Sequence, residues 1–320
     1  MVLALFACTP PVSLQAQRAA QDSLTWLRGN LHVHTNRSDG DSPPSIVIRW
    51  YQEHGYQFVA ITDHNTLTAA ADSSCPGFLV LPGIEVTDRV EGRPVHLNGI
   101  GVTRPIQPQG GSNVTSVIER NSVAIRGAGG LPILNHPNGL LRAYLKSEEI
   151  RGARSVSLFE VCCADYRGGS GVPSTDALWD SLLSSGRRLF AIAGNDAHIF
   201  QGESRQPGSA WVMVRAASLG GDAILQAIAN GAFYTTTGTE ILAVIYTFDT
   251  LSLQLPFSDG YGYRTFFIGR GGKVLAVDES RAPRYALRSD EDYVRARVER
   301  SDGTIAWVQP LFGPRYLDQH

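Results

Sequence analysis

The sequence predicts an α/β fold, most simply a parallel β/α barrel, followed by a small antiparallel β-sandwich. Two observations predict the barrel: short apolar runs alternate with helical segments, and most of these runs end in histidine, aspartate or glutamate. The sandwich is predicted because only strand-like runs separated by turns follow Gly238. We therefore expect a barrel domain over residues 24–237 and an accessory domain over residues 238–320.

Composition narrows the classes of function. The chain has 320 residues, 43% of them hydrophobic and 18% charged, which is typical of a globular protein with one large domain and one small domain. A net charge of −2 gives no sign of a basic surface for nucleic acid or for an anionic membrane. Extended nucleic acid is therefore not an expected partner, and a phosphate group would have to be bound by metals or single arginines.

Residues 1–23 are typical of an export signal followed by a linker. Residues 2–7 are apolar, and residues 5–8 (Leu-Phe-Ala-Cys) resemble a bacterial lipoprotein cleavage box that would leave Cys8 lipidated. Because no basic region precedes them, two alternatives stay open: signal-peptidase cleavage near residues 14–16, or a cytosolic N-terminus. We expect an exported protein that is periplasmic, secreted or attached to the membrane through Cys8.

The first strand of the barrel is expected in the short apolar run that leads into Leu31. A helix is expected from Pro44 to about His54, with Ser42 as its N-cap and proline in its first turn. The next elements are strands at 57–62, 78–84 and 95–101, a helix at 112–126, strands at 131–134 and 156–161, a helix at 175–185, strands at 189–194 and 210–214, and a helix at 222–230. The accessory strands are expected at 241–248, 263–268, 273–277, 285–287, 293–298 and 304–308.

Cysteines do not indicate a zinc knuckle. Cys162 and Cys163 are adjacent, which would strain a bridge between them, and the chain has no Cys-x-x-Cys pair. Cys75 could pair with one of them in an exported protein. We expect all three to be structural or free.

The clearest chemical signal is the segment from His32 to Gly40. His32 and His34 are two residues apart, so in an extended strand both imidazoles leave the same face. The turn at residues 38–40 can bring Asp39 back beside them. This arrangement is typical of a metal site, although a single His-x-His motif also occurs by chance.

Other residues of the same type follow the later strands. His54 and His320 lie outside this pattern and are interpreted as non-functional. The full set of candidate ligands is His32, His34, Asp39, His64, Glu85, His96, His136, Asp196 and His198.

The ordered motifs resemble the PHP family, the polymerase and histidinol phosphatase superfamily of metal-dependent phosphoesterases, over residues 28–237. The motifs are HVH at 32–34 with DG at 39–40, TDHN at 62–65, GIE at 83–85, His96, NHP at 135–137 and GNDAH at 194–198. The resemblance implies a distorted seven-stranded β/α barrel with two to three divalent metals (Zn, Mn or Fe) at the strand ends. Family members commonly have histidine where this chain has Asp39.

The resemblance also implies how the ligands are shared. It assigns the first metal to His32, His34, Glu85 and Asp196, the second to Glu85, His96 and His136, and the third to Asp39, His64 and His198. A water between the cations would lose its proton and attack phosphorus, so no serine or cysteine nucleophile is needed.

Other residues are expected to support this chemistry. We expect the ligands Glu85 and Asp196 to take part in catalysis. We also expect Asp63 to take part, by orienting a metal ligand without binding the metal itself. Arg37 and Arg205 are candidates for binding phosphate, and a solvated-loop interpretation stays open for both. Glu160 ends a strand, and three interpretations stay open: it faces the cleft, lies in the core, or is a partner of the ligands.

The predicted function is hydrolysis of a small phosphate mono- or diester. One alternative is a metal-dependent amidohydrolase, although neither Lys146 nor Lys273 lies at a barrel strand end to bridge metals. A second alternative is a surface- or carbohydrate-binding protein on a barrel without activity. The sequence does not identify the substrate, the metal, the role of the sandwich or the oligomeric state.

Overall fold

The structure is a computed structural model that describes residues 24–69, 73–137, 145–163, 175–202, 207–258, 260–314 and 316. The expected export segment, including Cys8, lies outside the described residues, so export and lipid attachment stay predictions. Arg205 also lies outside them. Within the described part of the chain, no helix is both long enough and apolar enough to cross a membrane.

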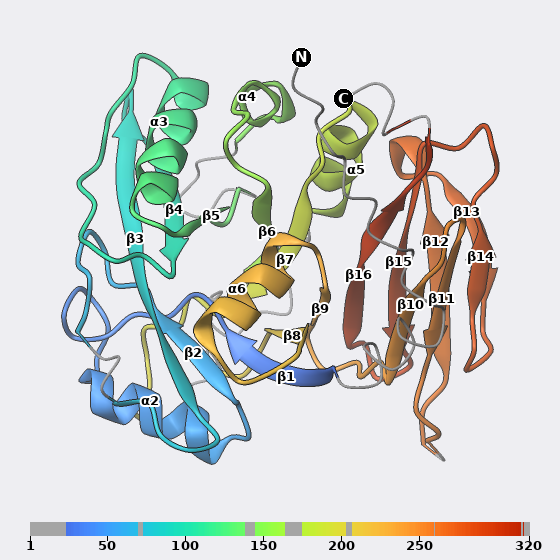
Figure 1. Cartoon of the computed structure of the whole chain (residues 1–320), viewed down its shortest axis with the longest axis horizontal. Coiled ribbons are helices and arrows are strands. Elements are labelled where there is room, and N and C mark those ends of the chain that lie inside the picture. The colour runs from blue at the N-terminus through green and yellow to red at the C-terminus, as the bar shows by residue number, and fades with distance from the viewer. Residues whose placement is uncertain are drawn as a thin grey trace, which may run out of the picture.

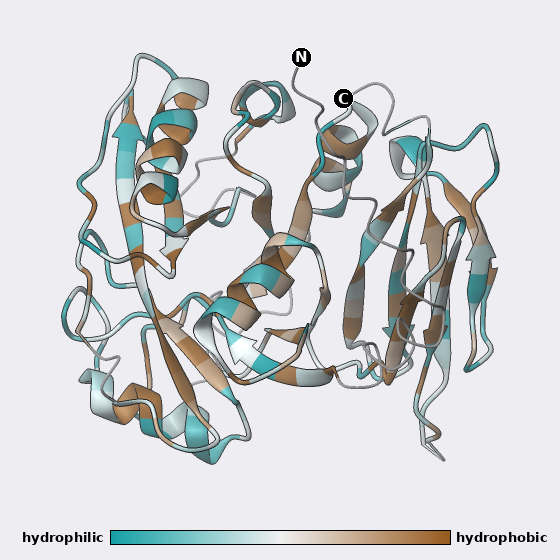
Figure 2. Ribbon diagram, in the orientation of Figure 1, coloured by the Kyte–Doolittle hydropathy of each residue, from teal (hydrophilic) through white to brown (hydrophobic). Residues whose placement is uncertain are grey.

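The first seven strands follow one another in space as they do in the sequence (Figure 1). They are β1 (Thr25–Asn30), β2 (Phe58–Ile61), β3 (Leu79–Val90), β4 (Arg93–Ile100), β5 (Leu131–Leu134), β6 (Leu158–Cys163) and β7 (Phe190–Gly194). The helices of this part are α2 (Pro44–Glu53), α3 (Val114–Gly127), α4 (Ser147–Gly152) and α5 (Asp176–Ser184). Hydrophobic and hydrophilic residues both occur along α3 (Figure 2), and its hydrophobic side is buried.

The strand directions correct the expectation of a parallel β/α barrel. Pairing is parallel from β1 to β3 and from β5 to β7, but β4 is antiparallel to both β3 and β5. The cause is a hairpin at Glu91 and Gly92, which joins β3 directly to β4 with positive φ angles at both turn residues. The α/β class is confirmed, whereas the alternation of one helix with each strand is not found.

The segments that follow β1 and β7 pair with each other. Val33 forms a parallel bridge with Ala197. The His34 N–H donates to the Ala197 carbonyl at 3.0 Å, and the Asp196 N–H donates to the His32 carbonyl at 3.1 Å. We call these paired residues, 32–34 and 196–197, the seam. The seam brings the first and the last of the seven strands together at the end where the candidate ligands lie.

The C-terminal strands continue the same sheet. They are β8 (Trp211–Ala216), β9 (Phe233–Thr236), β12 (Tyr263–Ile268), β13 (Val274–Asp278), β15 (Tyr293–Arg300) and β16 (Ile305–Phe312), with helix α6 (Gly221–Ala229) between β8 and β9. Because β8 pairs with β1, thirteen of the described strands form one sheet in the order β13-β12-β15-β16-β9-β8-β1-β2-β3-β4-β5-β6-β7.

A second, three-stranded sheet packs on this C-terminal part. It contains β10 (Ala243–Tyr246), β11 (Thr250–Gln254) and β14 (Arg284–Ala286). Leu251 and Leu253 from this sheet share one hydrophobic cluster with Phe267 and Val298 from the large sheet. The two sheets therefore share a hydrophobic core, and the larger one continues into the barrel strands, so a separate β-sandwich stays a prediction. The domain boundary at residues 237/238 stays a prediction.

Most expected elements lie within a few residues of their predicted ranges. Ser42 is not the N-cap of α2: Pro43 occupies that position, and no side chain caps the helix. The strand expected to stop before Glu85 continues to Val90, and β11 and α4 were not predicted. Of the cysteines, Cys75 and Cys162 are free thiols, so no disulfide joins these two.

A buried ion pair connects α5 to the C-terminal strands. Arg295 in β15 is 1% exposed and donates two hydrogen bonds of 2.7 Å to the carboxylate of Asp180 in α5. Asp176, also from α5, lies 2.9 Å from the same guanidinium group. The barrel part and the C-terminal part therefore share a largely buried charged contact.

Candidate metal centre

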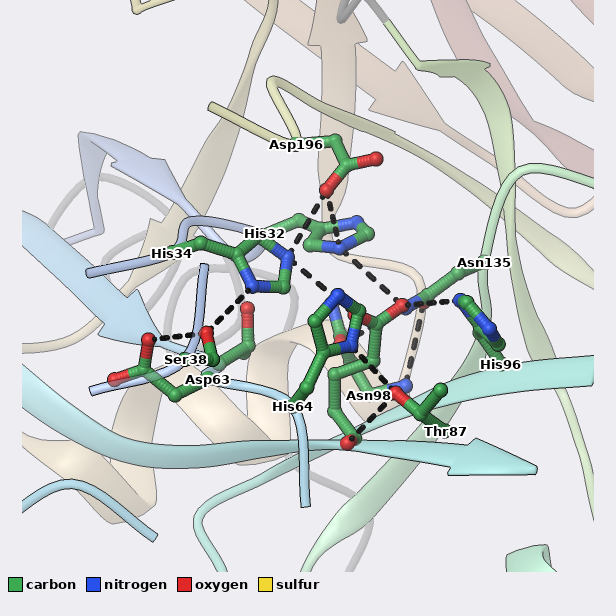
Figure 3. Close-up of polar contacts among 12 residues, drawn as sticks. His32, His34, Ser38, Asp63, His64, Thr87, His96, Asn98, Asn135 and Asp196 are labelled. Carbon is green, nitrogen blue, oxygen red and sulfur yellow. Dashed lines mark hydrogen bonds and ion pairs between the residues drawn. The ribbon is translucent and has the colours of Figure 1, made fainter. Parts of the chain in front are cut away.

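All nine candidate ligands lie in the described part of the chain and converge on one site. Figure 3 shows imidazole rings from different segments of the chain turned toward one another and toward carboxylates. Each of four groups places its ligand atoms within 4.8 Å of one another. The groups are His34–Asp39–His64–His198, His32–His136–Asp196, His32–His34–Glu85 and His64–Glu85–His96.

Glu85 is the centre of the cluster. Its side chain projects from β3 and is fully buried, and Asn135 donates a hydrogen bond of 2.7 Å to its Oε1 atom. The Glu85 oxygens lie 2.8 to 3.5 Å from nitrogens of His32, His34, His64, His96 and His136. A single carboxylate thus contacts five imidazoles, as a bridging ligand would.

Asp196 and His136 are held in unusual backbone conformations. Both have left-handed φ angles, 48° at Asp196 and 27° at His136, which are uncommon for residues with a Cβ atom. Such strain is typical of functional sites. At Asp196 it places Oδ1 3.0 Å from the Nε2 atoms of both His32 and His34.

The buried polar atoms fit a cation. Four of them, all directed into the cluster, have no well-oriented hydrogen-bond partner: His32 Nε2, His34 Nε2, Glu85 Oε2 and His96 Nδ1. Leaving such atoms unpaired in a protein interior is costly. A mixed set of imidazoles and carboxylates suits zinc, manganese or iron, so the donor set fits the implied metals.

One end of the cluster is open to solvent. The side chain of Asp39 is 54% exposed, and those of His64 and His198 are 26% and 21% exposed. Asp39 lies 3.4 Å from His64 Nε2 and 3.3 Å from His198 Nε2, as expected for the third group. His34 joins this group as well, since its ring stacks on that of His198 with centroids 4.1 Å apart.

Asp63 lies outside the metal-type groups and organises the loop that carries Asp39. Its carboxylate accepts hydrogen bonds of 2.7 Å from both the N–H and the hydroxyl of Thr35, and one of 2.9 Å from Ser38. Thr68 also donates to it. Ser38 in turn lies 3.5 Å from His34 Nδ1, so the Asp63 carboxylate is linked to the cluster through this loop, while the Asp63 carbonyl accepts a hydrogen bond of 3.2 Å from the Glu85 N–H. Its role in catalysis stays a prediction.

The two arginines proposed to bind phosphate are placed differently. Arg37 is exposed in the loop between His34 and Asp39, near the open end of the cluster. Arg205 lies outside the described residues, so its role stays a prediction.

Sequence reasoning missed several partners of the ligands. Asn98 accepts a hydrogen bond of 2.9 Å from the same amide of Asn135 that contacts Glu85, and Thr87 Oγ1 lies 2.5 Å from His64 Nδ1. Thr87 and Asn98 each follow a candidate ligand by two residues on a strand, so strand alternation places each of them on the same face as that ligand. That spacing was the available signal.

The open end of the cluster has strongly shifted pKa values. Burial lowers the pKa of His64, but hydrogen bonds to Asp39 and Glu85 outweigh it and raise the pKa to about 10. For His198, burial is likewise outweighed by the hydrogen bond to Asp39 and the charge of Asp196, which raise its pKa to about 9. Burial raises the pKa of Asp39, yet hydrogen bonds from His198 and His64 hold it far below its usual range.

These shifts predict that metal binding releases protons. Metal-free protein at pH 7.5 carries protons on His64 and His198, and a metal takes only neutral imidazole. We expect about two protons released per cation bound at this end, decreasing as the pH rises through 9 to 10. Calorimetric titration in two buffers with different heats of ionisation measures this number, and a value near zero at pH 7.5 would contradict the assigned charges.

The same shifts affect the stability of the metal-free fold. Both folded pKa values exceed the ordinary histidine value of about 6.5. Their contribution to stability is therefore complete below about pH 6.5 and is lost as the pH rises through 9 to 10.

Comparisons with known proteins bear on the fold. The chain has a PHP-like fold, the class that the strand arrangement and the site define, so the resemblance of the motifs is confirmed at the level of the fold. A two-domain protein of Bacteroides vulgatus that contains a predicted PHP-like metal-dependent phosphoesterase superposes with a TM-score of 0.50 and 15% identity. The match covers 91% of this chain and 89% of that protein.

Two further comparisons cover less of the chain. A protein of Bifidobacterium adolescentis assigned as a metal-dependent phosphoesterase is 18% identical, with a TM-score of 0.40, over 53% of this chain and 87% of its own. Phosphoribosyl 1,2-cyclic phosphate 1,2-diphosphodiesterase of Eggerthella lenta is 39% identical over 79 residues, which are 23% of this chain and 30% of that protein. No protein-family model matches the chain.

Proposed function

We propose that this protein is a metal-dependent phosphoesterase that hydrolyses a small phosphate mono- or diester. The observation that carries the proposal is the convergence of nine ligand-type side chains, several of them with buried atoms that lack a hydrogen-bond partner. The PHP-like fold supports the same class of enzyme. A further support is the short segment that is similar to a curated cyclic phosphodiesterase.

The proposed ligands divide by their position in the cluster. Two to three divalent cations (Zn, Mn or Fe) would be held by the buried groups around Glu85 and by the open group around Asp39. Cations in such a site lower the pKa of water and neutralise charge on phosphate oxygens. Glu85 and Asp196 supply the negative charge that keeps several cations close together, and the imidazoles complete the donor set.

The exposure of the cluster suggests how a substrate enters. Glu85 and His34 are fully buried, whereas Asp39 is half-exposed and His64 and His198 are partly exposed, so a phosphate group would approach from their end. Arg37 lies in the loop beside that opening and supplies a guanidinium that matches phosphate oxygens in pairs. This arrangement favours a small ester over a long charged polymer.

The position of the lysines favours a phosphoesterase over an amidohydrolase with a bridging lysine. Lys146 caps α4, and Lys273 follows the short 3-10 helix η3 (Arg270–Gly272) in the C-terminal part. Neither residue belongs to the cluster. The ligand set is also complete, which is not expected of a barrel that has lost its activity.

The proposal predicts metal-dependent hydrolysis that needs His136. We expect two to three cations of the Zn, Mn or Fe group per chain, and hydrolysis of 4-nitrophenyl phosphate or bis(4-nitrophenyl) phosphate that a chelator abolishes and the metal restores. H136A should reduce the rate by on the order of 10²-fold or more, because it removes one ligand of the buried group. Elemental analysis and the absorbance of nitrophenolate measure both quantities.

The matched control is H54A, since His54 is an exposed histidine at the end of α2 that stacks on Trp50 and contacts none of the candidate ligands. H54A should keep the metal content and the rate of the natural protein. Less than one cation per chain, with no hydrolysis after addition of each metal, would rule out the phosphoesterase. The ratio of monoester to diester rates then narrows the substrate class.

A further inference from the structure

Glu160 contacts two candidate ligands at atoms that do not face the cluster. Its Oε1 atom lies 2.7 Å from His32 Nδ1, and its Oε2 atom accepts a hydrogen bond of 2.7 Å from the backbone N–H of His136. The side chain projects from β6 and is 1% exposed. One buried carboxylate thus joins the segment after β1 to the segment after β5.

The fold leaves space for this contact at Gly194. A Cβ atom at that position would overlap Glu160 Oε1 and lie only 2.9 Å from the Cβ atom of His32. Gly194 is the last residue of β7 and comes two residues before Asp196. Three neighbouring strands therefore accommodate the pairing of Glu160 with His32.

The contact is on the nitrogen of His32 that does not face the cluster. A neutral His32 ring that binds a metal through Nε2 carries its proton on Nδ1, where Glu160 Oε1 can accept it. This Nε2 atom is buried, lacks a well-oriented hydrogen bond, and lies 3.0 Å from Asp196 and 3.5 Å from Glu85.

The Nδ1 atom of His198, unlike that of His32, has an uncharged hydrogen-bond partner. This atom lies 2.8 Å from the backbone carbonyl of Asp196, which orients the ring without adding a full charge. Glu160 orients His32 and also places a negative charge behind it, which makes the imidazole a stronger metal ligand. The contact with the strained backbone of His136 adds a second constraint.

We propose that Glu160 is a positioning residue that raises the metal affinity of the group formed by His32, His136 and Asp196, acting chiefly through His32. The inference rests on the proposed metal centre, but it concerns metal binding and not hydrolysis. Its test therefore does not depend on finding the substrate.

The test is a double-mutant cycle on zinc affinity, measured on the full chain by competition with a chromophoric chelator. E160Q keeps the shape of the side chain and removes its charge, and should weaken zinc binding by about 10- to 100-fold. In the H32A background, the same change should alter the affinity by less than about threefold, since the imidazole through which Glu160 acts is absent. E149Q, at a carboxylate paired with Arg93 away from the cluster, should leave the affinity unchanged.

Nitrogen NMR of the histidine rings in zinc-loaded protein provides a second measurement. The nitrogen resonances of His32 would not change if Glu160 only stabilised the fold. We expect a proton on Nδ1 of His32 in the natural protein and a changed resonance of that nitrogen in E160Q. If E160Q does not fold, G194A provides the second variant, because it crowds the same contact with no change of charge and should also weaken zinc binding.

Equal losses of affinity in the natural and H32A backgrounds would overturn the proposal, as would no loss in E160Q. Failure of the natural protein to bind zinc, manganese or iron would instead count against the proposed function itself. The two failures are therefore distinguishable.

Discussion

Replacing Glu85 with glutamine should lower kcat/KM for a phosphoester by on the order of 10³-fold and remove at least one cation per chain. The reason is that this carboxylate contacts the nitrogens of five histidines and receives a hydrogen bond from Asn135. A neutral amide cannot bridge two cations, and its NH₂ group would point at buried ring nitrogens. Steady-state kinetics with saturating metal and elemental analysis measure the two effects.

The matched control for E85Q is E149Q, which also neutralises one carboxylate but lies at the Arg93 ion pair near α4. E149Q should keep its cations and its rate. An E85Q variant that retains all its metal and a rate within tenfold of the natural protein would show that Glu85 is not a bridging ligand.

Replacing Asp180 with alanine should lower the free energy of unfolding by about 3 kcal/mol, because it leaves the buried Arg295 guanidinium without its bidentate partner. Asp176 still lies 2.9 Å from Arg295, which limits the loss. Denaturant unfolding of the metal-free protein measures the change, and the metal content should stay as in the natural protein.

The control for D180A is E279A, which removes the partner of Arg264 in a pair whose side chains are 67% and 57% exposed. Exposed pairs of this kind contribute about 0 to 1 kcal/mol. If D180A and E279A changed stability equally, the contact between α5 and β15 would not be a stabilising one.

The candidate ligands could be predicted because a metal site requires histidine, aspartate or glutamate, and these residues follow the predicted strands. His32 and His34 follow a strand at a spacing of two, and Asp196 and His198 repeat that spacing after the last barrel strand. The structure brings both pairs together through the seam. Local sequence carries this information, since alternation along an extended chain determines which side chains share a face.

Pairing between strands was less predictable, because it depends on partners far apart in the sequence. The apolar run before Glu85 gave no sign that β3 would continue to Val90 and turn back on β4. Likewise, the pairing of β8 with β1 spans most of the barrel, so nothing local indicated that the accessory strands extend the same sheet. Glu160 was ambiguous for the same reason: its partner His32 is 128 residues away.

The seam also has a consequence for the order in which the molecule assembles. Its two halves are separated in the sequence by all the intervening strands, so their contact is a long-range one. Because such a contact carries a loop-closure cost, we expect the seam to form late in folding and to open early. A cation bound to the ligands of the seam would slow the opening of the barrel and so prolong the lifetime of its closed form.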